Sequence, residues 1–457
     1  MIDRFACLKP ALAALLVFIR GKVFVAEAMG WEKLPAPVSL GVTVAPAGLR
    51  DRLSRLAHPH TGGRGRLRPA RGTAESGAVP WARAGRSPMW GAPFHASPRM
   101  PMPSLFDPLV VGDLTLPNRV IMAPLTRSRA GDSRIPNALM AKYYEQRASA
   151  GLLISEGVPV DPMGVGYAGV PGVWSAEQTQ GWRQVASAVH AAGGRIFMQL
   201  WHVGRISDPT FLDGRAPVAP SAIAAKGHVS LLRPERPYPT PRALETSEVQ
   251  DVVEAFRLGA QNAQKAGFDG VELHGANGYL LDQFLQDGAN QRTDQYGGSI
   301  ANRARLMLEC ADAAVSVWGS DRVGMHLAPR GDAHSMGDSD LAATFTHVAT
   351  ELGKRKLAFL CAREAEGPDS LGPQLKKAFG GVYIANERFT GASAQAALDA
   401  GWADAVAFGK DFLANPDLVE RLRTGAELNR WNLATFYSPG AEGYTDYPTL
   451  SELQAAD

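Results

Sequence analysis

The side chains of this sequence best suited to chemistry lie in one short stretch, residues 272–279, where polar groups follow an apolar run. His274 and Asn277 are three residues apart, and both can donate a hydrogen bond to a single oxyanion. Tyr279, two residues further on, can supply a proton nearby. The spacing therefore indicates a reaction in which an oxygen gains negative charge and a proton is added. Each residue taken alone also fits a satisfied polar position in a core.

Carboxylate and imidazole groups around the same stretch leave a second interpretation open. Glu272 and His274 alternate along one predicted strand and so project to the same side, while His326 lies in another strand. Since such groups are zinc ligands, a metal-dependent hydrolase that uses Glu272, His274 and His326 is the alternative function. No Asp-rich or His-x-His element accompanies them, so we predict that the protein has no metal site.

The last two predicted strands end in groups suited to binding a phosphate. One ends at Asn386 and Glu387, and the other at Gly409 and Lys410. Backbone N–H groups and a cation at this place commonly hold a phosphate in barrel enzymes. A phosphate-binding isomerase or aldolase is thus a third candidate, although no interior strand position convincingly offers the lysine that a Schiff base would need.

Composition indicates what kind of chain must position these groups. Of 457 residues, 45% are hydrophobic and 20% are charged, which excludes collagen-like, coiled-coil and wholly disordered proteins. Residues 1–101 hold fifteen Lys/Arg and five Asp/Glu, so the net charge of +2 divides into +10 there and −8 beyond. The acidic remainder argues against nucleic-acid binding. Three widely spaced cysteines offer no disulfide framework, and we expect a cytoplasmic protein.

Residues 1–101 differ from the rest of the chain. Arg, Gly, Pro and Ala dominate residues 40–102 without a regular hydrophobic period, which predicts a disordered, low-complexity basic leader. The apolar run at residues 11–19 is like the core of a signal peptide but too short to span a bilayer as a helix, and we expect no membrane association. Alternatively the leader is a start-site artefact, and the protein begins with the domain predicted at 102–457.

Beyond the leader, short β-rich runs alternate with longer amphipathic segments. A hairpin-like stretch at 109–118 precedes eight predicted strands, at 119–124, 151–156, 195–200, 270–274, 322–328, 357–361, 381–385 and 403–408. Predicted helices lie at 137–149, 176–192, 248–266, 300–318, 341–355 and 392–400. Several are followed by a glycine suited to a C-cap, namely Gly193, Gly267, Gly319 and Gly401.

This alternation predicts an α/β fold, a (β/α)8 TIM barrel with an N-terminal hairpin. A doubly wound sheet is the competing fold, but the first strand is not followed by the glycine fingerprint that such sheets usually carry. In a barrel the active site lies at the C-terminal ends of the strands, which is where the residues described above are expected.

Six ordered motifs between residues 104 and 450 resemble the Old Yellow Enzyme family, in particular its bacterial N-ethylmaleimide, pentaerythritol-tetranitrate and xenobiotic reductases. The motifs are FDPL (106–109), NRVIMAPLTRSR (118–129), QLWHVGR (199–205), ELHGANGYLL (272–281), NQRTDQYGGS (290–299) and GAEGYTDYP (440–448). A single motif would be weak evidence, but the ordered set is highly specific. The resemblance implies an FMN-dependent ene-reductase that takes hydride from NADPH or NADH.

The resemblance also implies how FMN is held. The backbone of Ala123, Pro124 and Leu125 would pass under the flavin ring, Thr126 would hydrogen-bond its O4 edge and Gln199 its pyrimidine edge. His326 would lie at the N1–O2 edge. The phosphate would be held by backbone N–H groups near Asn386, Glu387 and Gly409 and by the Lys410 ammonium.

The same resemblance implies the roles of the substrate-side residues. His274 and Asn277 would bind the activating oxygen of an electron-poor alkene (enone, maleimide or nitroalkene), and Tyr279 would protonate its α-carbon. Nitrate-ester or nitro reduction would be a side activity. Aromatic walls would be formed by Tyr167, Trp201 and Tyr437, although plain packing also explains these side chains. The sequence does not distinguish a monomer from a homodimer.

Three positions depart from the family's pattern. His326 stands where the family has an arginine, so we expect a weaker and more pH-sensitive influence on the flavin, and we predict that His326→Arg raises its midpoint potential. Lys410 replaces an arginine and loses bidentate geometry toward a phosphate. Glu387 replaces a glycine, and a positive φ there would strain it and require its carboxylate to point away from the phosphate. FMN affinity is the property that these positions affect.

Overall fold

The computed structural model describes residues 15–19, 22–26, 102–331 and 333–456. The chain divides into two compact units, residues 1–93 and 94–457. In the first unit, β1 (Leu15–Ile19) and β2 (Lys22–Ala26) form an antiparallel pair that includes part of the apolar run. The remainder of the predicted leader lies outside the described residues.

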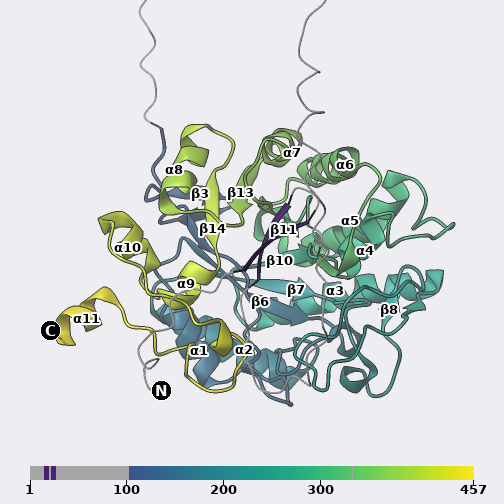
Figure 1. Cartoon of the computed structure of the whole chain (residues 1–457), viewed down its shortest axis with the longest axis horizontal. Helices are drawn as coiled ribbons and strands as arrows, with labels where there is room; N and C mark the ends of the chain where they lie inside the picture. The colour runs from purple at the N-terminus through teal and green to yellow at the C-terminus, as the bar shows by residue number, and fades with distance from the viewer. Residues whose placement is uncertain (1–14, 20–21, 27–101, 332, 457) are drawn as a thin grey trace, which may run out of the picture. The chain divides into compact units, whose positions relative to one another are not determined.

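The second unit is built around a closed barrel of eight parallel strands, with helices around it (Figure 1). The barrel strands are β5 (Val120–Met122), β6 (Leu152–Pro159), β7 (Ile196–Trp201), β10 (Gly270–Gly275), β11 (Val323–Leu327), β12 (Phe359–Arg363), β13 (Val382–Asn386) and β14 (Ala405–Phe408). Strand β14 pairs with β5 and closes the ring. Each predicted strand overlaps one of these, and the predicted barrel is confirmed.

The helices lie where the sequence period changes from 2 to 3.6. Their bounds are α1 (Ala138–Glu145), α2 (Ala176–Ala191), α3 (Thr246–Lys265), α4 (Leu280–Leu285), α5 (Ile300–Trp318), α6 (Leu341–Lys354), α7 (Gly372–Phe379), α8 (Gly391–Asp399), α9 (Lys410–Ala414), α10 (Leu418–Thr424) and α11 (Leu450–Ala456). Short 3₁₀ turns lie at Pro162–Gly164, Pro209–Phe211, Ser320–Arg322, Ala333–Ser335 and Leu433–Thr435. A small parallel pair joins β8 (Val218–Ala219) to β9 (Arg242–Ala243).

Helix ends follow the capping chemistry of the sequence. Ser175 and Gln178 form a reciprocal capping box at the start of α2. All four predicted C-cap glycines have positive φ, between 72° and 84°. The predicted helices do not include α4, α7, α9, α10 and α11, which have only five to eight residues each and so present few turns for a hydrophobic period.

An antiparallel hairpin, β3 (Leu109–Val111) with β4 (Leu114–Leu116), covers the N-terminal end of the barrel. Its apolar side chains join the same core cluster as Phe197 and Phe359 from the barrel strands. Gly112, at the tip, has a φ of 58°, and a Cβ there would lie 2.0 Å from the Asp321 carbonyl oxygen that precedes β11. The hairpin thus blocks one end of the barrel, and the opposite end remains for the site.

Parallel strands that are buried on both faces divide their side chains between an outer core under the helices and the barrel interior. Within the part of the chain that the structure describes, no helix is both long enough and apolar enough to cross a membrane.

Candidate active site

The C-terminal ends of the barrel strands surround a cavity of about 720 Å³. Every residue predicted for the site lines this cavity except Tyr167. The predicted lining residues are Ala123, Pro124, Leu125, Thr126, Gln199, Trp201, His274, Asn277, Tyr279, His326, Asn386, Glu387, Gly409, Lys410 and Tyr437. Strand ends as far apart in sequence as Ala123 and Lys410, 287 residues, therefore meet in one place, because parallel strands present their C-terminal ends on one side.

The end of β10 supplies the groups suited to bind an anionic oxygen. His274 lies opposite His326 in the β10–β11 ladder, and Asn277 follows in the left-handed region with a φ of 59°. Burial lowers the pKa of His274 well below its usual value, with further lowering by His326 and Arg363. The imidazole is therefore neutral at neutral pH, and its buried Nδ1 has no hydrogen-bond partner among the residues that the structure describes.

Tyr279 is the N-cap residue of helix α4, and its hydroxyl is protonated. Burial raises the pKa of its hydroxyl, which lies 2.9 Å from the hydroxyl of Tyr167. The His274 and Tyr279 ring centroids are 5.0 Å apart. Tyr167 thus contacts the site through Tyr279 and does not line the cavity itself, which differs from the wall position that the sequence suggested.

Trp201 packs against Tyr279 and Tyr167. It is 1% exposed, its ring lies edge-on to Tyr279 at 4.8 Å and it stacks on Tyr167 at 5.6 Å. Gly157 makes room for it, since a Cβ at that position would lie 2.6 Å from the indole. Both interpretations of Trp201 hold together, because it is packed in the core and also lines the cavity.

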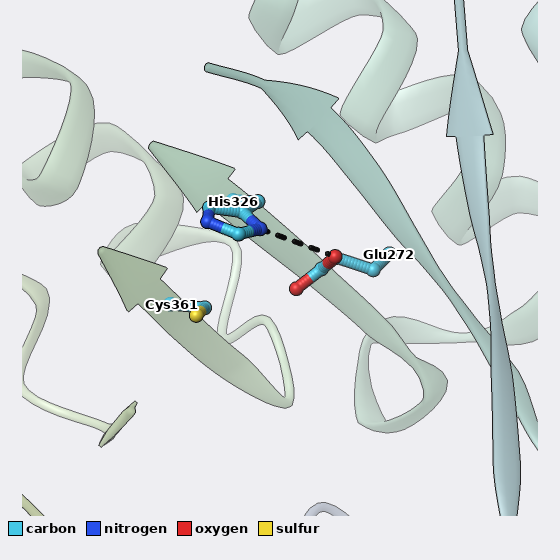
Figure 2. A group of neighbouring side chains, drawn as sticks. All are labelled: Glu272, His326 and Cys361. Carbon is cyan, nitrogen blue, oxygen red and sulfur yellow. Dashed lines mark ion pairs between the residues drawn. The ribbon is translucent and has the colours of Figure 1, made fainter. Parts of the chain in front are cut away.

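The floor of the cavity is a buried polar cluster on neighbouring strands. Gln199 Nε2 donates to Glu272 Oε2 at 2.8 Å and lies 3.3 Å from His326 Nδ1. His326 Nδ1 is 3.5 Å from the same carboxylate oxygen, and Cys361 lies beside it on β12 (Figure 2). In the described part of the chain, Glu272 Oε1 and His326 Nε2 have no hydrogen-bond partner.

The ends of β13 and β14 carry charges. Glu387 has a φ of 106° and Arg388 one of 61°, so the positive φ on which the predicted strain depended is present at both residues. The Glu387 carboxylate pairs with Arg363 at 2.5 Å and with Arg388 at 3.3 Å. The Lys410 ammonium lies 4.6 Å from the centroid of the Trp431 ring.

The C-terminal segment closes one side of the cavity with Trp431 and Tyr437. Two buried arginines of the loop after β5 hold this segment by its carbonyls. Arg127 donates to the oxygens of Phe436 and Gly443 at 3.1 and 2.7 Å, and Arg129 donates to Phe436 at 2.7 Å. The motif 118–129 therefore places a wall of the site as well as a strand.

Residues 104–429 match the NADH:flavin oxidoreductase / NADH oxidase family. The chain belongs to this family. A probable flavin mononucleotide-dependent alkene reductase from Leishmania infantum is 42% identical over 358 residues, 76% of this chain and 97% of the relative. The 12-oxophytodienoate reductase 7 of Oryza sativa subsp. japonica is 40% identical, over 76% of this chain and 95% of its own length.

Solved structures agree with these relatives. Morphinone reductase in complex with tetrahydroNAD is 50% identical, with a TM-score of 0.74 over 76% of this chain and 98% of that one. An Old Yellow Enzyme homologue from Zymomonas mobilis is 42% identical, with a TM-score of 0.74 over 76% of this chain and 100% of that one. The predicted Old Yellow Enzyme membership, the dependence on FMN and a nicotinamide reductant, and the alkene-reductase activity are confirmed.

The residues around the cavity fit a flavin. The cavity volume is within the range of cofactor sites, about 300–1,000 Å³. Three buried nitrogens of lining residues have no hydrogen-bond partner within the described ranges: Trp201 Nε1, His274 Nδ1 and His326 Nε2. Ring and carbonyl atoms of a flavin or of its substrate can meet such groups.

The metal-dependent hydrolase is not supported. Among the described residues, the group that could hold a metal contains Glu272, His326 and Cys361, with ligand atoms within 4.8 Å of one another, and it does not include His274 (Figure 2). Burial raises the pKa of the Cys361 thiol, so the thiol keeps its proton. The family comparison assigns oxidoreductase chemistry, not hydrolysis, to this chain.

Nine cavity residues were not among those predicted for the site, namely Gly157, Arg363, Arg388, Phe389, Thr390, Ala407, Phe408, Asp411 and Trp431. Arg363 is the last residue of β12, whose predicted strand ended two residues too early, at 361. Of the charged pair that follows β13, Glu387 and Arg388, only Glu387 was recognised in the sequence as a departure from the family's pattern. Nothing in the local pattern around Trp431 indicates that its segment returns to the barrel mouth.

Proposed function

We propose that this alkene reductase acts on small electron-poor alkenes whose double bond is conjugated to a carbonyl or nitro oxygen, such as enones, maleimides and nitroalkenes. The observation that carries the proposal is the convergence of His274, Asn277 and Tyr279 on one cavity wall, above a floor that contains Gln199. Two of these groups can bind the activating oxygen of such an alkene, and the third, a protonated phenol, can donate a proton to its α-carbon.

His274 and Asn277 bind the activating oxygen and stabilise the negative charge that it gains in the transition state. Since His274 is neutral, it acts as a hydrogen-bond donor and does not transfer a proton to the oxygen. Tyr279, whose raised pKa keeps the phenol protonated, gives its proton to the α-carbon. Tyr167 holds the Tyr279 hydroxyl in place through their 2.9 Å contact.

Thr126, Gln199 and His326 are proposed to hold the ring of FMN, and Lys410, with the backbone of residues 386, 387 and 409, its phosphate. When bound, FMN would supply the hydride that is added to the β-carbon of the alkene, with NADPH or NADH as the source of that hydride. The hydrogen bond from Gln199 to Glu272 in the floor fixes the orientation of the glutamine amide. A cytoplasmic location is also proposed, which fits the free, buried state of Cys310 and Cys361.

The test is an anaerobic titration of the purified protein with NADPH and, separately, NADH, followed by addition of 2-cyclohexenone. We expect the flavin absorbance to bleach with the nicotinamide and to recover with the enone, with cyclohexanone as product. Bleaching without recovery with enones, maleimides or nitroalkenes would refute the proposed substrate class. A protein that does not bind added FMN would refute the proposed cofactor contacts.

A further inference from the structure

Asn277 is held from two directions. Its backbone carbonyl accepts a hydrogen bond from His334 Nδ1 at 2.7 Å, and its side-chain Oδ1 accepts one from Arg363 Nη1 at 2.9 Å. Because a guanidinium has donors only, the end of the amide that faces Arg363 must be the oxygen. The Nδ2 group has no protein acceptor among the described residues, and Asn277 lines the cavity, so the NH2 end remains for a ligand.

Arg363 is positioned by its strand and by one carboxylate. On β12 it lies two residues beyond Cys361, which pairs with His326 in the β11–β12 ladder, so its side chain starts on the interior side of the barrel. Its Nε donates to Glu387 Oε2 at 2.5 Å. The guanidinium therefore bridges the loop after β10 and the loop after β13, across the end of β11.

The charge of Arg363 reaches the catalytic groups. It contributes to the lowered pKa of His274, and it partly opposes the rise in the pKa of Tyr279 that burial causes. A donor whose own acceptor atom is bound to a cation is a stronger donor, because the two bonds polarise each other.

We propose that Arg363 is a positioning residue of the reaction, which fixes the Asn277 amide with its NH2 end toward the substrate oxygen and polarises it. The inference rests on the proposed function of Asn277. Without the guanidinium the amide can turn over and present Oδ1 to an oxygen that becomes negative, which is repulsive. The loss is greater in the transition state than in the ground state, since the charge on the oxygen is greater there.

The experiment is a double-mutant cycle of Arg363→Met and Asn277→Ala in the FMN-loaded enzyme, with the rate of reoxidation by 2-cyclohexenone measured after reduction by NADPH. We expect Asn277→Ala to slow reoxidation by about 100-fold, the cost of one oxyanion donor. Arg363→Met is expected to slow it by roughly 10-fold in the native background and by less than about 2-fold with Asn277→Ala, because it acts through the amide. Arg363→Lys should recover part of the rate, since one donor is restored.

Arg330→Met is the matched control. Arg330 follows the neighbouring strand β11 and pairs with Glu364 at 2.5 Å, but it does not line the cavity. Its removal costs a comparable ion pair and should leave the reoxidation rate within about 2-fold of native. Equal effects of Arg363→Met in both Asn277 backgrounds, or no effect, would overturn the inference.

A second readout is independent of turnover. In protein labelled with ¹⁵N-asparagine, the side-chain NH2 resonance that disappears in Asn277→Ala belongs to Asn277, and Arg363→Met should shift it. An unshifted resonance would overturn the inference, whatever the activity. Failure of native enzyme to be reoxidised by any alkene would instead refute the proposed function, so the two failures are distinguishable.

Discussion

The two sides of the cavity are built from different kinds of residue. The side at the end of β10, which is the substrate side under the proposed function, presents His274, Asn277 and Tyr279, which are uncharged, hydrogen-bonding groups. The side formed after β12, β13 and β14 presents charges, with Glu387 paired to both Arg363 and Arg388. The first side agrees with the family's motifs, and the second contains two of the three departures from them.

The difference shows where this chain can diverge without losing its chemistry. In the proposed function, donors on the substrate side have to lie close to a reacting oxygen and carbon, which constrains their identity and spacing. On the other side, backbone N–H groups and any suitably placed cation can hold a phosphate. Glu387 and Arg388, at positive φ, store backbone strain of about 1–3 kcal/mol each there.

The largest effect is expected from Tyr279→Phe on the substrate side. Removal of the proton donor should slow reoxidation of the reduced flavin by an enone by about 10²- to 10⁴-fold. Reduction by NADPH should be nearly unchanged, because that half-reaction needs no proton from Tyr279. Stopped-flow absorbance measures both steps, with Tyr167→Phe as a milder companion variant. An equal loss in both half-reactions would show that Tyr279 serves the fold and not the proton transfer.

His326→Arg tests the floor between the two sides. A permanent guanidinium beside the N1–O2 edge should stabilise the reduced flavin and raise its midpoint potential by roughly 30–60 mV, where 30 mV corresponds to 1.4 kcal/mol for two electrons. Spectroelectrochemical titration measures the potential, and His326→Gln controls for loss of the imidazole without a gain of charge. An unchanged or lower potential would contradict the assigned place of His326.

Lys410→Arg tests the phosphate side. A guanidinium can bind a phosphate by two parallel hydrogen bonds, so FMN should bind about tenfold more tightly, a gain of about 1.4 kcal/mol. Fluorescence quenching of FMN during titration measures the Kd. Lys376→Arg is the matched control, because Lys376 pairs with Asp404 and does not line the cavity. Equal effects of the two replacements on the Kd would show that Lys410 does not bind the phosphate.

Arg388→Gly should relieve strain on the same side. Glycine adopts a φ of 61° without penalty, and the exposed pair with Glu387 contributes little, so we expect a gain of about 0.5–1 kcal/mol. The melting temperature should rise by about 1–3 °C. Arg388→Ala removes the same side chain without the glycine freedom and should give no gain. If Arg388→Ala raised the melting temperature as much as Arg388→Gly, the gain would come from loss of the arginine side chain and not from relief of backbone strain.

The smallest effect concerns pH on the substrate side. Burial holds the pKa of His274 below its usual value of 6.5, so the imidazole stays neutral as pH falls from 8 to 6. Protonation would add a charged donor and tighten binding, so an unchanged Kd of 2-cyclohexenone for the oxidised enzyme is expected over this range. The same measurement in His326→Arg, which lacks the neighbouring imidazole, shows whether a change in the Kd comes from residue 326. Binding that tightens as pH falls would show that His274 titrates there.

Much of the site could be predicted because its residues lie in strand ends with characteristic neighbours. His274, Asn277 and Tyr279 are close in sequence, so their convergence needs only the turn between β10 and α4. Arg363 could not be found in this way, because its two partners are 86 residues before it and 24 after it. Tyr167 was predicted to line the substrate side of the site. Its contact with the Tyr279 hydroxyl depends on its packing against Trp201, which the sequence does not show.

The sequence by itself determined the alternation of strands and helices, the barrel that it implies and the chemical identity of the substrate-side donors. These depend on local periodicity and on residue type, which act over a few residues. Only the tertiary structure decided which charges meet across the cavity, which end of the Asn277 amide faces Arg363 and which residues take positive φ. Those features depend on contacts between distant strand ends, whose distances are fixed only when the barrel closes.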